Sequence, residues 1–123
     1  MRKKRVSGSP KRGEVWIVNF DPTVGSEIRK TRPAVVLQNN IGNHFSAVTI
    51  VAAITSRSDE SLYPVEAPIE PPEGGLPKRS VVLLNQIRTV DKKRMVKKIG
   101  MLTGDTMNTV NRALLISLGL IDL

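Results

Sequence analysis

The order of the predicted elements constrains the fold more than any other feature of the sequence: short apolar strands come first and one helix comes last. Residues 13–20 predict the first strand because apolar side chains alternate between two faces, with Val15 and Ile17 on one and Trp16, Val18 and Phe20 on the other. The strand–helix alternation of a parallel α/β fold is missing from the pattern. We therefore predict a mainly β, α+β fold: an antiparallel, partly barrel-like sheet with a C-terminal helix.

Two further strands are predicted in the first half of the chain. Residues 33–38 (PAVVLQ) are apolar and β-branched, and Pro33 stands at the first position, where a strand tolerates the missing N–H. Residues 39–46 (NNIGNHFS) are typical of a turn-rich connector. Residues 47–55 (AVTIVAAIT) are almost continuously apolar, so we expect a strand at the centre of the sheet, covered on both faces.

The second half of the chain predicts loops, strands and then the helix. Residues 56–79 hold most of the prolines and two adjacent glycines, which predicts surface loops around a short strand near residues 63–67, with no core residues. Residues 80–90 predict a strand, and residues 91–100 a turn and a short strand. A cap and a helical spacing of apolar residues then predict the helix: Thr103 as cap, Asp105 in the first turn, and Met107, Val110, Leu114 and Leu118 on one face.

The length and the charge of the chain indicate one domain behind a basic leader. The 123 residues fall short of the roughly 150 of an ordinary domain. Six of the 19 basic residues precede Glu14, and the other 13 nearly balance the 11 acidic residues. We expect residues 1–12 to form a disordered basic tail and residues 13–123 a single domain. Such a tail is typical of a solubilising leader, and non-specific phosphate binding is the alternative.

The composition argues against several classes of function. Without cysteine there is no disulfide, Cys-based zinc site or thiol nucleophile. His44 is the sole imidazole and is expected in an exposed loop, and the acids are scattered, so we expect no metal and no cofactor. No glycine-rich phosphate motif supports nucleotide chemistry. Without an apolar run long enough for a membrane span or a signal peptide, we expect a cytoplasmic protein with no membrane contact.

The loop at residues 25–33 (GSEIRKTRP) carries most of the chemistry that remains. The planar guanidinium of arginine can hold a phosphate and stabilise the charge that develops on it during transfer. Further polar candidates stand at strand positions: Thr55, Ser56, Gln86 and Arg88. A phosphodiester is the natural target of such a set. The alternative is a solvated loop with weak surface ion pairs.

These residues occur in an arrangement that resembles the MazF/PemK-like toxins, the sequence-selective endoribonucleases of type II toxin–antitoxin modules. The resemblance covers residues 11–123 and begins with KRGEVWIVNFDPTVGSEIRKTRPAVVLQN. It continues through IGNHFS, VAAIT, SVVLLNQIRTVD and ALLISLGLID. The most specific part is GSE, four residues and then RP, followed at the family's spacing by AAIT and QIRT.

The resemblance implies an SH3-like, partly open β-barrel of the CcdB/PemK type, a homodimer, and metal-independent cleavage of single-stranded RNA, with messenger RNA as the expected substrate. Arg32 of the RP pair and Thr55 at the end of AAIT match the family's catalytic positions, and Glu27 of GSE is a second-rank candidate. Arg32 would bind the scissile phosphate while the ribose 2′-OH attacks, giving 2′,3′-cyclic phosphate and 5′-OH ends. Thr55 would hydrogen-bond a phosphate oxygen or hold the attacking group, and Glu27 would be a weak general base.

Base recognition is expected from loop and strand residues, because unpaired RNA exposes its base edges. The expected RNA contacts are Ser26, Ile28, Arg29, Lys30, Pro33, Ser56, Arg57, Gln86 and Arg88. The chain departs from its relatives in the bulky, basic EIRKTRP segment and in Asn85, where an acid is common, so the recognised RNA sequence stays open. The expected protein partner is an antitoxin whose acidic, poorly ordered segment folds into the RNA groove.

Two other functions stay open on the sequence. CcdB-like toxins share the fold family and poison a topoisomerase by protein contact, in which case residues 120–123 would matter more than Arg32. A catalytically inactive module that binds RNA or DNA is the other, and its binding would depend on the basic tail. The presence of both Arg32 and Thr55 favours the nuclease.

Overall fold

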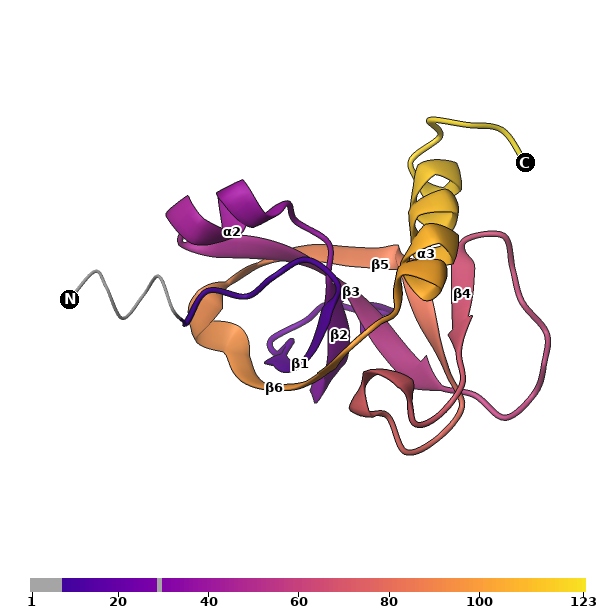
Figure 1. Cartoon of the computed structure of the whole chain (residues 1–123), viewed down its shortest axis with the longest axis horizontal. Helices are drawn as coiled ribbons and strands as arrows, with labels where there is room; N and C mark the ends of the chain where they lie inside the picture. The colour runs from indigo at the N-terminus through magenta and orange to yellow at the C-terminus, as the bar shows by residue number, and fades with distance from the viewer. Residues whose placement is uncertain (1–7, 29) are drawn as a thin grey trace.

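The computed structural model of the protein describes residues 8–28 and 30–123 (Figure 1). In these residues the strands are β1 (Glu14–Asn19), β2 (Thr31–Val36), β3 (Val48–Ser56), β4 (Glu66–Ile69), β5 (Ser80–Asp91) and β6 (Met95–Met101). The helices are α2 (Asn40–Phe45) and α3 (Gly104–Ser117), with short 3-10 turns η1 (Glu73–Gly75) and η2 (Lys92–Arg94). Within the same residues, no helix has the length and apolar character that a membrane span requires.

The strands form one antiparallel sheet in the order β4-β5-β3-β2-β1-β6, so β3 lies inside the sheet as predicted. β3 pairs with β5 in two stretches: residues 48–52 with 87–91 and, beyond a bulge, residues 54–56 with 80–82. A bulge increases the local twist and bends the strand that carries it. β4 and β6 end the order and do not pair with each other, so the curled sheet stays open, as the predicted partly open barrel requires.

Buried side chains lie on both faces of the sheet because neighbouring residues of a strand point in opposite directions. Val35 and Ala52 belong to the larger core, which α3 covers. Ala34 and Val51 belong to a second core on the other face. α3 contributes three buried side chains to the larger core: Met107, Val110 and Ala113. The continuous apolar run of β3 is therefore explained by burial on both faces.

The start of α3 agrees with the sequence. Thr103 is the N-cap, and its Oγ1 accepts a hydrogen bond from the Thr106 N–H at 3.2 Å. Asp105 lies in the first turn, where the helix dipole favours an anion. Leu118 was expected on the buried face but lies at the C-cap and is 51% exposed. The buried face of α3 therefore ends one turn before the apolar pattern does.

Three local predictions were wrong. The connector at residues 39–46 contains the helix α2, which begins because the Asn39 side chain accepts the Gly42 N–H at 2.7 Å. Pro33 is the third residue of β2 and not its first; there β2 pairs with β1 alone, before its pairing with β3 begins. The segment 56–79 does supply core residues: Ala67 and Ile69 of β4 are buried, and so is Leu76 in the loop that follows.

The ordered contacts of the domain extend back into the predicted tail. Arg12 donates from Nε to the Leu37 carbonyl at 2.8 Å and from Nη2 to Asn111 Oδ1 at 2.6 Å. Its backbone N–H reaches Asn40 Oδ1 at 2.7 Å. Residue 12 therefore connects the residue after β2 with α2 and α3, whereas the part of the predicted tail at residues 1–7 lies outside the described residues.

Candidate functional site

Arg32 and Thr55 meet where β2 begins and β3 ends. The two strands are antiparallel with Ala34 opposite Ala53, and continuing this register by two residues brings Arg32 level with Thr55. Both side chains line one pocket of ≈ 270 Å³. The other residues around this strand-end pocket are Pro33, Ile54, Ser56, Leu76, Pro77, Lys78 and Ser80. A rigid sheet thus holds a guanidinium beside a hydroxyl at an open end of two strands.

The strand-end pocket has an apolar base and a polar rim. Ile54 and Leu76 are buried, whereas Arg32 and Thr55 are half-buried and Ser56 is exposed. Ser80 is buried and its hydroxyl donates to the Lys78 carbonyl at 2.9 Å, which fixes the loop on the far side. The pocket therefore presents two cations and two hydroxyls to a group bound on its open side.

A second recess of ≈ 330 Å³ lies between the β1–β2 loop and the middle of β5. Its lining residues are Glu27, Ile28, Asn85, Gln86, Ile87 and Arg88. The Gln86 side chain bridges the two walls, accepting the Ile28 N–H at 3.2 Å and donating to the Ser26 carbonyl at 3.5 Å. Arg88 donates to the Phe20 carbonyl at 2.5 Å. Polar β5 side chains therefore hold the loop in place as well as line the recess.

The β1–β2 loop is shaped by its own backbone contacts. Lys30 has a positive φ of 69°, and its N–H is held by the Asp21 carboxylate at 2.8 Å. The Glu27 carboxylate accepts the Val24 N–H at 2.7 Å, so it closes a turn within the loop. Glu27 lines the β5 recess and not the strand-end pocket. The structure therefore separates Glu27 from Arg32 and Thr55.

A third recess, of ≈ 530 Å³, adjoins the strand-end pocket and is lined by Ser56, Arg57, Ser58, Lys78 and Arg79. Arg57 makes two bonds to the Glu66 carboxylate, at 2.6 and 2.9 Å, and these bonds lower the pKa of Glu66. Arg79 pairs with Glu70 at 2.8 Å and donates to the Asp59 carbonyl at 2.6 Å. Both arginines are therefore engaged in holding the β3–β4 loop.

The predicted site residues fall into these neighbouring groups. The strand-end pocket brings together Arg32, Pro33, Thr55 and Ser56; the β5 recess brings together Glu27, Ile28, Gln86 and Arg88; and Arg57 lines the third recess. Ser26 contributes its carbonyl to Gln86, and Lys30 is exposed in the loop. Arg29 lies outside the described residues.

Sequence reasoning missed the wall formed by Leu76, Pro77 and Lys78. The segment was read as a surface loop because of its prolines and glycines. The missed signal was Leu76, an apolar residue shortly before a strand, whose side chain is 3% exposed. Burying it against the larger core places Lys78 at the mouth of the strand-end pocket.

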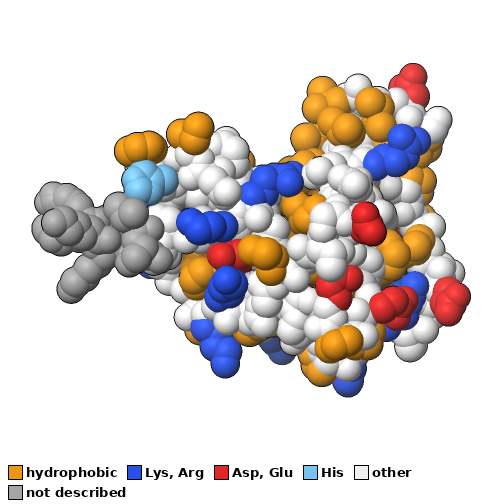
Figure 2. Space-filling model, in the orientation of Figure 1, with side chains coloured by type: hydrophobic (Ala, Val, Ile, Leu, Met, Phe, Trp, Pro, Cys, Tyr) orange, Lys and Arg blue, Asp and Glu red, His pale blue; other side chains and the backbone are white. Residues whose placement is uncertain are grey.

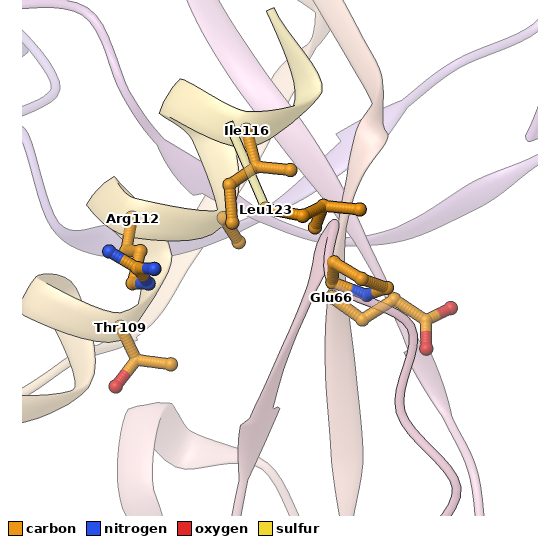
Figure 3. A pocket seen from close by; sticks show the side chains of 7 residues that line it. Glu66, Thr109, Arg112, Ile116 and Leu123 are labelled. Atoms are coloured by element: carbon orange, nitrogen blue, oxygen red, sulfur yellow. The ribbon is translucent and has the colours of Figure 1, made fainter. Parts of the chain in front are cut away.

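One further pocket, of ≈ 280 Å³, lies between α3 and β4 (Figure 3). Arg112 and the Glu66 carboxylate point to opposite sides of it, while Ile116 and Leu123 lie between them. Apolar side chains also gather over the end of α3 (Figure 2). The exposed ones are Leu115, Leu118, Leu120 and Leu123. This end of the molecule offers an apolar contact surface rather than converging reactive groups.

The chemistry available at the strand-end pocket is charge stabilisation. Among the described residues, no three His, Asp or Glu side chains gather as they would around a metal ion. His44 lies in α2 and not in the loop expected for it. The centroids of the His44 and Phe45 rings are 4.4 Å apart. An arginine beside a hydroxyl suits an anionic group that gains charge during reaction, as a phosphoryl group does.

The chain is similar to known proteins in both sequence and structure. A family model described as a PemK-like, MazF-like toxin of type II toxin-antitoxin systems matches residues 11–118. Endoribonuclease EndoA of Bacillus subtilis strain 168 is 46% identical over 112 residues, which cover 91% of this chain and 97% of that protein. The crystal structure of MazF from Deinococcus radiodurans is 28% identical, with a TM-score of 0.77 over 90% of this chain and 97% of that one.

A mycobacterial endoribonuclease, solved in complex with its cognate antitoxin, has the same fold. Its TM-score is 0.76 at 24% identity, and the alignment covers 94% of this chain and all of that one (100%). The SH3-like, partly open barrel expected from the sequence is thus confirmed by solved structures.

Proposed function

Because this chain belongs to the PemK-like, MazF-like toxins of type II toxin–antitoxin systems, we propose that it is an endoribonuclease that cuts single-stranded RNA, messenger RNA above all, without a metal ion. The observation that carries the proposal is the single pocket that holds both Arg32 and Thr55 at the adjoining ends of β2 and β3. Cutting cellular RNA would stop translation and growth, which is the purpose of a toxin. We accordingly propose a cytoplasmic location, where the proposed substrate is found.

The proposed reaction is a transesterification. The ribose 2′-oxygen forms a bond to the phosphorus, the bond from phosphorus to the 5′-oxygen breaks, and the products are a 2′,3′-cyclic phosphate and a 5′-OH end. Arg32 binds the non-bridging oxygens with its planar fork and stabilises the charge that they gain. The Thr55 hydroxyl donates to one of these oxygens or holds the attacking 2′-OH.

The 2′-OH must lose a proton and the departing 5′-oxygen must gain one. Glu27 is the proposed acceptor, although its carboxylate is held by the Val24 N–H. The role therefore requires the β1–β2 loop to move when RNA binds. Such a movement would break the Val24 contact and would have to overcome the Gln86 bonds that hold the loop against β5.

Base recognition is proposed for the β5 recess and the loops beside it. Gln86 and Arg88 line that recess together with the backbone near Ile28. Asn85 also lines it and offers an amide rather than a carboxylate to a base edge. The remaining proposed contacts are Ser26, Arg29, Lys30, Pro33, Ser56 and Arg57. Splayed bases of unpaired RNA present donors and acceptors that such side chains can read.

Two protein partners are proposed, a second copy of the chain and an antitoxin. The apolar end of α3 and the C-terminal leucines give a surface suited to contact between copies. The antitoxin would place an acidic segment over Arg32 and Lys78, with its carboxylates in the position of RNA phosphates. Salt should weaken that association.

The test is to incubate the protein and its Arg32→Ala variant with a long unstructured RNA in EDTA, and to map the cut sites and the end groups. We expect cuts at one short motif, with cyclic-phosphate and 5′-OH ends, and a loss of about 100-fold or more in the variant. Equal cutting by the variant would remove Arg32 from the mechanism. Intact RNA with both proteins would refute the nuclease and direct attention to a gyrase supercoiling assay.

A further inference from the structure

We infer that Lys78 binds the RNA phosphate next to the scissile one, so that the strand runs from the strand-end pocket into the recess between the β3–β4 loop and the start of β5. The inference rests on the proposed nuclease function. It adds an RNA-binding residue from a segment, residues 76–79, that carries none of the catalytic or base-recognition roles proposed above.

The first argument is position. Lys78 lines both the strand-end pocket and the third recess, and Ser56 is the other residue that they share. The two hollows therefore meet at the line between these two side chains. A strand whose scissile phosphate lies beside Arg32 and Thr55 reaches the third recess only by passing Lys78.

The second argument is charge. The third recess contains two arginines, but Glu66 neutralises Arg57 and Glu70 neutralises Arg79. Lys78 is exposed and forms no ion pair with any residue that the structure describes. Of the three cations lining the recess, Lys78 is therefore the one whose charge is left for a bound phosphate.

The third argument is the support of the Lys78 backbone. Its carbonyl accepts the buried Ser80 hydroxyl at 2.9 Å, and the neighbouring Arg79 carbonyl accepts the Arg57 N–H at 3.0 Å. The loop is thus held on both sides of the recess while the ammonium stays in solvent. A fixed backbone lowers the ordering cost of binding, because the side chain alone must be immobilised.

The experiment measures RNA binding and cleavage for Lys78→Ala and for Lys97→Ala, a matched control that removes another exposed lysine, on β6. Binding is measured against a random-sequence, fully 2′-O-methylated single-stranded RNA pool, which cannot undergo 2′-OH attack, over a range of salt concentrations. We expect Lys78→Ala to reduce the salt slope of log K by about 0.7 relative to the control, and affinity at 0.1 M salt by roughly fivefold. Cleavage of natural RNA should show a raised KM, an unchanged kcat and the same cut sites.

The outcomes separate this inference from the proposed function. A Lys78→Ala protein with the salt slope and affinity of Lys97→Ala would overturn the inference, whether or not the wild-type protein cuts RNA. A changed cut-site motif would also overturn it, because a phosphate contact carries no base information. If the wild-type protein leaves RNA intact, the nuclease proposal fails, while the slope measured on the uncleavable pool still decides whether Lys78 binds a phosphate. Equal melting temperatures would show that both variants are folded.

Discussion

At the scale of single residues, some side chains of the proposed site would contact the substrate, whereas others also hold the backbone in place. Arg32 and Thr55 are held by different strands, so each can be replaced while the register of the sheet keeps the other in place. Gln86 has a scaffolding role as well, because its amide bridges the backbone at Ser26 and Ile28. If replacing Gln86 lowered activity, the loss could come from base recognition or from the order of the loop. Replacing Thr55 tests the role of one side chain in the reaction without disturbing that loop.

Thr55→Val should lower kcat/KM for RNA cleavage by about 10- to 100-fold. Valine keeps the branched shape that suits a strand but removes a hydroxyl that donates to a charged phosphate, an interaction of about 1.5–3 kcal/mol. Thr55→Ser keeps the hydroxyl and should stay within a few-fold of wild type. The measurement is initial cleavage rate against RNA concentration, with thermal melts of both variants. Equal rates for the valine and serine variants would exclude a role for the hydroxyl.

Glu14 should make stability depend on acid pH. Burial opposes its ionisation, but hydrogen bonds from Trp16 Nε1 and the Lys11 N–H, together with the Lys98 ammonium, outweigh burial and lower its pKa below 4.5. A lowered folded-state pKa gives stability that is present above about pH 4.5 and lost as pH falls through the folded pKa.

Glu14→Gln should therefore reduce the free energy of unfolding at pH 7 by about 1.5–3 kcal/mol, the range for hydrogen bonds to a charged group. Below pH 4 its loss of stability on acidification should be shallower than that of wild type. Urea unfolding at several pH values measures both effects. Parallel pH curves for the two proteins would show that Glu14 carries none of the acid dependence.

At the scale of elements, close backbone packing fixes η1 against β6. A Cβ at Gly100 would lie 2.3 Å from the Gly74 carbonyl carbon, and one at Gly75 would lie 2.0 Å from the Ile99 carbonyl oxygen. These approaches allow the loop that follows η1 to bury Leu76 and to hold Lys78 beside the strand-end pocket. The geometry of the site therefore depends on Gly100, which is distant from Lys78 in sequence, as well as on the glycines of η1.

Gly100→Ala should destabilise the protein by about 1–3 kcal/mol, because the backbone of η1 must move to admit the methyl group. Gly104→Ala is the matched control: nothing lies within 4 Å of its added Cβ, and alanine favours a helix. Chemical denaturation gives both values. If the two variants prove equally stable, the contact between η1 and β6 is looser than the structure indicates.

The sequence predicts most elements because the spacing of apolar residues matches the period of a strand or a helix. The prediction fails where side-chain hydrogen bonds determine the local structure. The segment at α2 looks like a turn because Asn and Gly dominate it, yet Asn39 caps a helix and the buried Asn43 amide bonds Gln38 and Thr49. The meeting of Arg32 and Thr55 in one pocket is predictable, because the sequence marks both residues at the ends of strands. Lys78 is not, because its place depends on packing between segments distant in sequence.

At the scale of the whole molecule, the N-terminal segment supplies a large share of the net positive charge. Residues 1–7 contribute four basic residues to a net charge of +8, and the domain that follows is closer to neutral. Truncating the N-terminal segment can therefore separate long-range attraction to RNA from recognition of RNA at the site. The proposed nuclease needs only recognition at the site.

Deleting residues 1–7 should leave cleavage and the melting temperature unchanged, because every contact that the structure describes is retained, while low-salt RNA affinity falls with the lost charge. Deleting residues 1–12 also removes Arg12, which connects Leu37, just beyond β2, with α2 and α3 through three hydrogen bonds. That truncation should lower the melting temperature by about 5 °C or more, given about 1 kcal/mol for each lost bond. Melting curves and cleavage rates at matched salt measure both. Abolished RNA binding in the shorter deletion, with the fold intact, would make the tail the functional element and the domain a binding module rather than a nuclease.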